Sequence, residues 1–193
     1  MTIGSFYRRS FERRPWLTLA ITNGGLTLLA DVLAQSVERI TRTDLAPQPD
    51  WDYARSARFL TYGTAMGPFL AEWNKFLEFK FPIRSPSGAM LVGGLARRVM
   101  ADQILMAPIT MGLFVGAMGM MEGRLTYESL KEKFGELYVP ALLANWKIWP
   151  FLQMFNFGVL PLRMRVPFAA SCGVLWNLYL SILNRSKSSD VTA

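Results

Sequence analysis

The amino-acid sequence predicts an all-α fold, a polytopic bundle of membrane helices that forms a single domain over residues 1–193. Three observations favour this class. Of the 193 residues, 51% are hydrophobic and only 18% are charged. The mean hydropathy of +0.21 is positive. The formal net charge of +7 is concentrated in short connectors between long uncharged runs. Together these features are typical of a helical membrane protein and exclude a disordered chain.

The lengths of the uncharged runs predict four membrane spans. An α-helix rises ~1.5 Å per residue and the bilayer hydrocarbon is ~30 Å thick, so a spanning helix needs roughly 20 mostly apolar residues. Residues 103–121 and 166–184 each give 19 residues without a charge, and residues 15–37 carry only Asp31. Residues 59–71 give only 13, so the flanking Arg58 and Glu72 must reach the interface or a polar interior. We expect spans at about 15–37, 56–79, 99–121 and 165–184.

Two further segments differ from these spans. Over residues 125–138, Leu130, Phe134 and Tyr138 recur every four positions among charged residues, which predicts an amphipathic helix. This helix lies either at the membrane surface or against a partner helix. Residues 139–162 are apolar and rich in Trp and Phe but interrupted by prolines. They either lie in the membrane interface or form a fifth span, which would place the two termini on opposite sides.

The composition excludes several classes of chemistry. The chain has no histidine and one cysteine, so His-based triads, His-ligated zinc and internal disulfides are ruled out. It contains no metal-ligand cluster, phosphate loop or nucleophile motif. We therefore expect no enzymatic activity, no catalytic residues, no cofactor and no metal ion. Direct nucleic-acid binding is not expected either, because the basic residues are scattered and no recognition motif accompanies them.

Polar residues in or beside the spans are the candidate functional residues. An ionisable group near the bilayer centre costs at least ~2.5 kcal/mol, so each needs a partner or a wet cavity. One interpretation is that they line a water-filled path; the other is that they form interhelical pairs, for example Asp102 with Arg58 or Arg98. For these residues taken together we favour the water-filled path, because charges of both signs occur on three helices. The set comprises Asp31, Gln35, Arg58, Arg98, Asp102, Gln103, Gln153, Asn156 and Arg165.

Two glycine pairs predict close helix contacts. Gly63 and Gly67 lie four residues apart in the second expected span, as do Gly112 and Gly116 in the third. Because glycine lacks a Cβ atom, such faces let helix backbones approach closely. The contacts can form within the chain or between copies, and we expect a homo-oligomer.

The most specific signature lies near the C-terminus. The run Asn145-Trp146-Lys147-Ile148-Trp149-Pro150 is followed by Trp176-Asn177. These residues resemble the C-terminal signature of the Mpv/PMP family, small integral membrane proteins of the mitochondrial inner membrane and the peroxisome. Other motifs occur in the family's order along nearly the whole chain, among them Arg13-Arg14-Pro15 and Asp102-Gln103.

Within that family the chain is most similar to the fungal stress-response member of the mitochondrial inner membrane. The motifs that indicate this are Arg13-Arg14-Pro15, Asp31-Val32-Leu33-Ala34-Gln35 and Met121-Glu122-Gly123. The resemblance implies a four-span protein that forms a weakly selective pore or supports metabolite balance under stress. It transfers no catalytic residues. Because peroxisomal members share the motifs, the peroxisomal membrane is the alternative location.

Two functions are therefore considered. The first is a weakly selective pore for small solutes or ions in the mitochondrial inner membrane, which supports metabolic homeostasis and the stress response. The alternative is a membrane scaffold that does not transport but organises anionic lipid or a partner complex. The second is motivated by the basic connectors, since each Lys or Arg near an anionic bilayer contributes ~1 kcal/mol of attraction. Membrane lipids are the expected partners in both cases.

Overall fold

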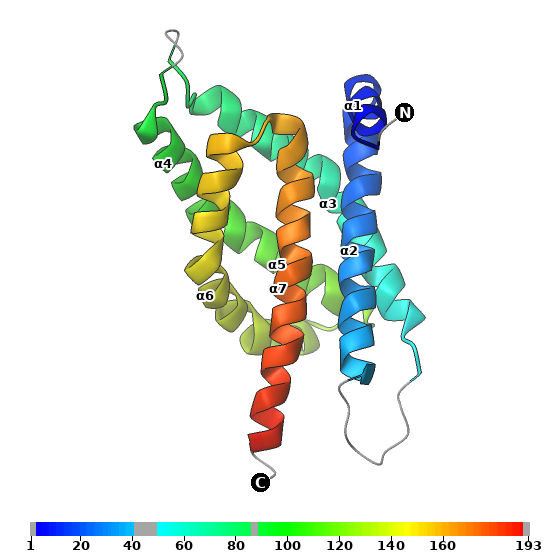
Figure 1. The fold of residues 1–193 in the computed structure, drawn as a ribbon. Coiled ribbons are helices and arrows are strands. Elements are labelled where there is room, and N and C mark those ends of the chain that lie inside the picture. The colour runs from blue at the N-terminus through cyan, green and yellow to red at the C-terminus, as the bar shows by residue number, and fades with distance from the viewer. Residues whose placement is uncertain (1–2, 41–49, 86–88, 191–193) are drawn as a thin grey trace. The chain divides into compact units, whose positions relative to one another are not determined.

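The protein is described from a computed structural model, which covers residues 3–40, 50–85 and 89–190 of the backbone, and the side chains up to residue 176. Its helices are coloured in chain order in Figure 1. In chain order they are α1 (Ile3–Arg13), α2 (Pro15–Ile40), α3 (Tyr53–Lys80), α4 (Val92–Ala101), the π-helical segment η1 (Asp102–Met106), α5 (Ala107–Met121), α6 (Tyr127–Val159) and α7 (Leu162–Asp190).

The described residues confirm the all-α class. Their only β-type pairing is an isolated bridge between Arg84 and Met90 in the connection from α3 to α4. Two helical stretches, Pro15–Ile40 and Val92–Met121, are long and apolar enough to cross a membrane. The other two expected spans are also helical, within α3 and α7, but they do not reach that combination of length and apolarity in the described residues. Four spans therefore stay a prediction.

Three element boundaries differ from the expectation. The third expected span begins earlier, because the helical run extends from Val92 to Met121. The amphipathic and aromatic segments are not separate but form the single 33-residue helix α6, with Pro140 and Pro150 inside it. Each proline removes one backbone hydrogen bond without ending the helix. Helix α1 was not expected, since no element was predicted before residue 15.

The described helices gather into two compact units, Met1–Ala71 with Val166–Ala193, and Glu72–Arg165. The expectation of a single domain stays a prediction. The core of the first unit contains Leu19, Ala71 and Val166, with Phe11 and Leu70 packed against them. In this unit, apolar residues of α2 and of the N-terminal part of α3 are buried together, which places the polar residues of these helices next to one another.

The contact between α2 and α3 is close enough to require glycine. A Cβ atom at Gly67 would lie 2.5 Å from the backbone oxygen of Leu19, and one at Gly63 would lie 1.9 Å from Oγ1 of Thr27. Asn23 donates from Nδ2 to the carbonyl oxygen of Gly63 over 2.7 Å. The glycine pair of α3 therefore lies against α2 within the same chain, where its small size lets the side chains of α2 reach the backbone of α3.

The second unit is built around Leu77, Val99 and Phe157. Here α6 packs on α5, and the rings of Phe134 and Tyr138 lie over Gly112 and Gly116. A Cβ atom at Gly112 would lie 3.7 Å from the Tyr138 ring, and one at Gly116 would lie 3.7 Å from the Phe134 ring. Both are ordinary van der Waals distances. This glycine pair thus receives aromatic rings and does not form a backbone-to-backbone contact.

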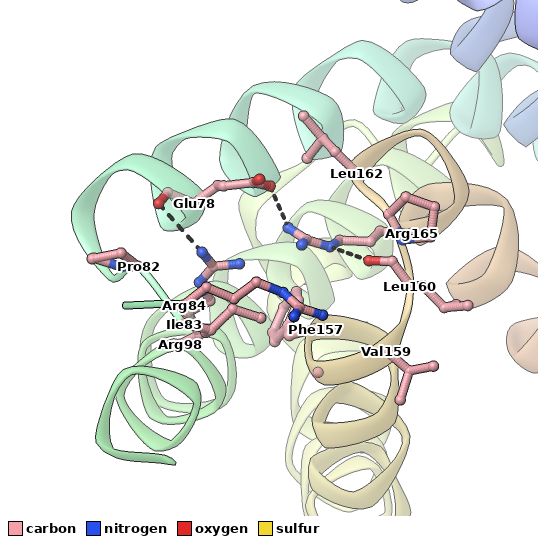
Figure 2. A pocket seen from close by; sticks show the side chains of 12 residues that line it. Glu78, Pro82, Ile83, Arg84, Arg98, Phe157, Val159, Leu160, Leu162 and Arg165 are labelled. Atoms are coloured by element: carbon pink, nitrogen blue, oxygen red, sulfur yellow. Dashed lines mark hydrogen bonds and ion pairs between the residues drawn. The ribbon is translucent and has the colours of Figure 1, made fainter. Parts of the chain in front are cut away.

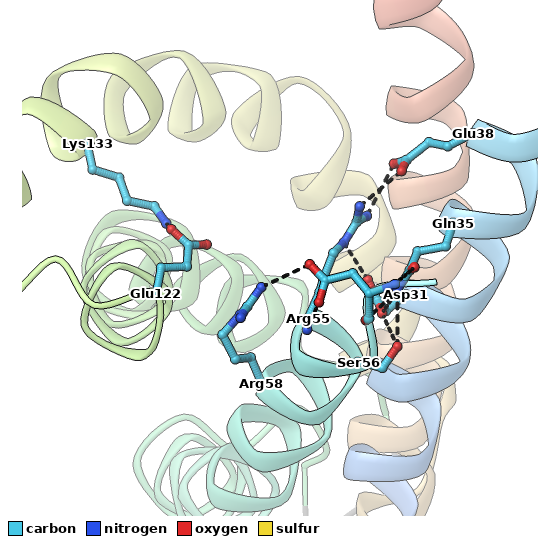
Figure 3. Close-up of polar contacts among 9 residues, drawn as sticks. Asp31, Gln35, Glu38, Arg55, Ser56, Arg58, Glu122 and Lys133 are labelled. Atoms are coloured by element: carbon cyan, nitrogen blue, oxygen red, sulfur yellow. Dashed lines mark hydrogen bonds and ion pairs between the residues drawn. The ribbon is translucent and has the colours of Figure 1, made fainter. Parts of the chain in front are cut away.

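The amphipathic part of α6 therefore packs within the chain. The N-cap of this helix is Thr126, whose Oγ1 accepts a hydrogen bond from the backbone N–H of Ser129. Lys133 is buried on the packed face and pairs with Glu122, the residue that follows α5 (Figure 3). Its packing partner is therefore α5, and a position at the membrane surface stays a prediction.

Candidate functional site

The candidate site is centred on Asp102, at the start of the π-helical segment. The backbone N–H of Ala107 donates to the carbonyl oxygen of Asp102, five residues earlier, so the turn holds one residue more than an α-helical turn. Such single π turns occur frequently at functional sites. The next residue, Pro108, has no N–H, which leaves the carbonyl oxygen of Gln103 without its helical donor. The indole Nε1 of Trp146 on α6 donates to that oxygen over 2.8 Å.

The carboxylate of Asp102 accepts hydrogen bonds from three neutral side chains. Trp73 Nε1 donates to Oδ1 over 3.0 Å, while Gln103 Nε2 and Gln153 Nε2 donate to Oδ2 over 2.8 and 2.7 Å. Asn156 Nδ2 in turn donates to Oε1 of Gln153 over 2.8 Å. Residues on α3, η1 and α6 thus form one network, in which four of the predicted candidates lie together.

The carboxyl group of Asp102 has no cationic partner among the described residues. Asp102 is 7% exposed, and no Lys or Arg among the described residues forms an ion pair with it. Two further acceptors, Oε1 of Gln103 and Oδ1 of Asn156, are buried and receive no hydrogen bond from the described residues. A carboxyl group without a cation and two amide oxygens without donors are costly to bury among apolar helices, which makes this network the candidate site.

Asp31 has a different environment, in the first unit (Figure 3). The carboxylate is almost fully buried and forms an ion pair with Arg55, with Oδ1 at 2.6 Å from Nε. Ser56 Oγ and Gln35 Nε2 donate to Oδ2 over 2.7 and 2.8 Å. Arg55 also pairs with Glu38, Nη1 to Oε2 at 3.0 Å. The charge of Asp31 is therefore neutralised locally.

The ion pairs suggested for Asp102 are wrong. Arg58 pairs with Asp52 at 3.5 Å, on the surface of the first unit. Arg98 donates from Nε to the carbonyl oxygen of Phe81 over 2.6 Å. The physical reason is that helical side chains tilt toward the N-terminus of their helix, so Arg98 reaches back to the end of α3 and away from Asp102. An arginine four residues before an acid is also the less favourable order for a helical pair.

Several residues of these clusters were missed from the sequence. Trp73 supplies a donor to Asp102, and Arg55 and Ser56 supply partners to Asp31. Arg165 was among the predicted candidates, but its partner Glu78 was missed; Nη1 of Arg165 lies 2.9 Å from Oε2 of Glu78. The available signal for Arg55 was its position at the start of an expected span, where an acid on another span needs a cation. Nothing in the local pattern marked Trp73.

The C-terminal signature residues lie on α6 and α7. Asn145, Trp149 and Pro150 are half-buried on α6, and Trp146 is 41% exposed although its indole N–H is bonded. Trp176 is half-buried on α7. The side chain of Asn177 lies outside the described residues.

Replacing Trp146 with phenylalanine is expected to destabilise the protein by about 1 kcal/mol, because the carbonyl oxygen of Gln103 loses its donor beside Pro108. The free energy of unfolding in detergent, followed by circular dichroism, measures this. Trp149→Phe is the matched control, since the indole of Trp149 has no hydrogen-bond partner among the described residues. Equal losses in the two variants would mean that the bond to Gln103 contributes nothing.

The described residues are almost entirely helical, and two of the helical stretches are long and apolar enough to cross a membrane, each with a buried carboxyl group. Residues 119–181 match the model of the Mpv17 / PMP22 family. The chain is 38% identical to Protein sym-1 of Neurospora crassa over 181 residues, which cover 93% of this chain and 98% of that protein. The chain belongs to the Mpv17/PMP22 family.

Two other relatives align over a similar length. Protein SYM1 of Saccharomyces cerevisiae is 34% identical over 185 residues, covering 95% of this chain and 91% of the relative. PXMP2/4 family protein 4 of Dictyostelium discoideum is 29% identical over 183 residues, covering 94% and 93%. No solved structure matches the chain. The matches extend across both units, so the family assignment applies to the whole chain.

Proposed function

We propose that this protein is a weakly selective pore of the mitochondrial inner membrane that passes small solutes or ions and supports metabolic homeostasis under stress. The observation that carries the proposal is the Asp102 network. A carboxylate without a counter-ion on a helix able to span the bilayer is expensive unless it serves a solute or water. The relatives named SYM1 support the mitochondrial location, with the peroxisomal membrane as the alternative.

The polarity of the network indicates which solutes it favours. Because Gln103 donates its amide N–H to Asp102, its Oε1 faces away as an acceptor, and Asn156 is left with a free Oδ1 for the same reason. The network therefore contains a carboxyl group and two acceptor oxygens, all buried inside the Glu72–Arg165 unit, and solutes would reach them only if the surrounding helices open. Hydrated cations and hydrogen-bond donors interact favourably with such groups, whereas anions are repelled.

We predict that Asp102→Asn lowers the cation-to-anion permeability ratio by about tenfold, the effect of losing ~1.4 kcal/mol of cation stabilisation. Purified protein reconstituted in planar bilayers, with reversal potentials measured in a salt gradient, gives this ratio. Asn keeps the size of the side chain and can still accept from Trp73. Asp52→Asn is the control, because Asp52 is an exposed carboxylate paired with Arg58.

If the bilayers do not conduct although incorporation of the protein has been verified, the pore proposal is excluded. If Asp102→Asn conducts with an unchanged cation-to-anion permeability ratio, the protein is a pore but Asp102 does not line it. A change of equal size in Asp52→Asn would indicate a general surface-charge effect.

A second candidate function is a scaffold that organises anionic lipid without transport. The neutralised cluster around Asp31 favours it, since this buried charge needs no water or solute. Native mass spectrometry with mixed lipids tests it, and no preference for anionic lipid would count against it. A homo-oligomer remains part of both proposals. The two predicted glycine pairs are occupied within the chain, so they give it no support.

A further inference from the structure

A second polar site lies in the Glu72–Arg165 unit (Figure 2). None of the residues that hydrogen-bond to Asp102 is among its lining residues, although Asn156 of the Asp102 network donates to the carbonyl oxygen of Arg165 over 3.4 Å. It is a pocket of about 460 Å³, within the usual range for ligand sites. Its walls come from the end of α3, the connection to α4, α4 itself, the end of α6 and the first residues of α7. Its charged lining residues are Glu78, Arg84, Arg98 and Arg165.

The pocket carries excess positive charge. Three arginines and one glutamate give a net charge of 3 − 1 = +2. Glu78 is already paired with Arg165. No carboxylate of the described chain lies within ion-pair distance of Arg84 or Arg98. Figure 2 shows the guanidinium groups of these arginines gathered between Glu78 and Phe157. Like charges gathered in this way repel one another unless an anion lies among them.

Arg98 has an unfilled bonding position. Its side chain is 1% exposed, and Nε and Nη2 donate to the carbonyl oxygens of Phe81 and Glu78 over 2.6 and 3.3 Å. Those two bonds are explained by the end of α3, where carbonyl oxygens lack helical donors. Nη1 is buried and has no partner in the described residues. Hydrogen bonds to the end of α3 therefore explain the positions of Nε and Nη2 of Arg98, but they do not explain the buried Nη1. They also do not explain why Arg84 lies in the same pocket.

We infer that this pocket binds a phosphate group. Guanidinium groups from three separate segments can each donate to a different oxygen of a tetrahedral anion, and a charge of +2 matches a phosphate better than a single carboxylate. Two of its lining residues, Glu78 and Arg165, lie at the ends of the expected spans 56–79 and 165–184. The phosphate can therefore belong to a lipid headgroup or to a soluble phosphate compound. The inference is independent of Asp102 and of the proposed pore.

The experiment uses the full chain in neutral detergent. Native mass spectrometry measures binding of phosphatidate against diacylglycerol, which has the same acyl chains without the phosphate, and calorimetry measures binding of inorganic phosphate. Arg84→Gln and Arg98→Gln each remove a guanidinium from the pocket. Arg97→Gln removes the same charge from the neighbouring, exposed position of α4. Circular dichroism reports whether each variant is folded.

We expect the protein to bind phosphatidate more tightly than diacylglycerol, and Arg84→Gln to weaken phosphate binding about tenfold, as for loss of a charge-assisted bond. Arg97→Gln should leave binding within about twofold. Because Arg84 is exposed, its variant keeps the inference testable even if Arg98→Gln does not fold. If Arg84→Gln weakens the binding of phosphatidate alone, the natural ligand is a lipid headgroup. If it weakens the binding of both phosphatidate and inorganic phosphate, the pocket also accepts a soluble phosphate compound. Binding of neither probe, or equal losses in Arg84→Gln and Arg97→Gln, would overturn the site.

Discussion

Replacing Gly67 with alanine is expected to destabilise the first unit by about 3 kcal/mol, the upper part of the usual range for overpacking. The added Cβ atom would lie 2.5 Å from the oxygen and 2.8 Å from the carbonyl carbon of Leu19. Both are backbone atoms, so no side chain can rotate away to relieve the clash. Helix α2 would have to move away from α3, which would also lengthen the bond from Asn23 to Gly63. The free energy of unfolding in detergent measures the loss.

Gly25→Ala is the matched control for this prediction. Gly25 is also helical, on α2, and a Cβ atom there would meet nothing within 4 Å. Because alanine favours a helix over glycine by about 1 kcal/mol, this variant should be as stable as the natural protein or slightly more stable. If Gly67→Ala behaves like Gly25→Ala, the close approach of α2 and α3 is incorrect.

The second large effect is expected for Arg55→Gln, which should destabilise the protein by about 3 kcal/mol because it leaves the buried carboxylate of Asp31 without its cation. The lower end of the range for buried pairs applies, since the Arg55 side chain is 30% exposed. Adding Asp31→Asn removes the charge that was left unpaired, and the double variant should regain most of the lost stability. Unfolding free energies of the two single variants and the double variant give the coupling between the residues.

Arg58→Gln serves as the control for charge removal from the same helix. Arg58 pairs with the half-exposed Asp52 at 3.5 Å, and pairs of this kind contribute about 1 kcal/mol or less. If the double variant Arg55→Gln with Asp31→Asn is as unstable as Arg55→Gln alone, the lost stability comes from packing of the Arg55 side chain and not from the unpaired carboxylate of Asp31.

The clusters around Asp31 and Asp102 differ in what they imply for function, although both acids lie in apolar helices. Asp31 is paired with a cation and receives hydrogen bonds from Ser56 and Gln35 on Oδ2, so its charge is balanced although Oδ1 accepts no hydrogen bond from the described residues. Asp102 is held by neutral donors alone. The sequence pattern treats the two alike, since each acid has a glutamine close by in the same helix. Only the donors contributed by other helices separate a structural carboxylate from a candidate transport site.

By itself, the sequence determined the helical class, the positions of the apolar runs and the polar residues that interrupt them. These properties follow from local composition and periodicity, which depend on neighbours along the chain. The two helices able to span a membrane, Pro15–Ile40 and Val92–Met121, include the first and third expected spans. The candidates around Asp102 were also all visible as polar residues on apolar segments.

The tertiary structure decided what each of those residues touches. The donor from Trp73 is 29 residues distant from Asp102 and the donor from Gln153 is 51, so no local pattern connects them. The extra residue in the η1 turn and the arginine pocket likewise depend on where the ends of α3, α6 and α7 meet α4. Helix formation is governed by short-range interactions, whereas the partner of a buried charge is selected by packing between helices that are distant in the chain.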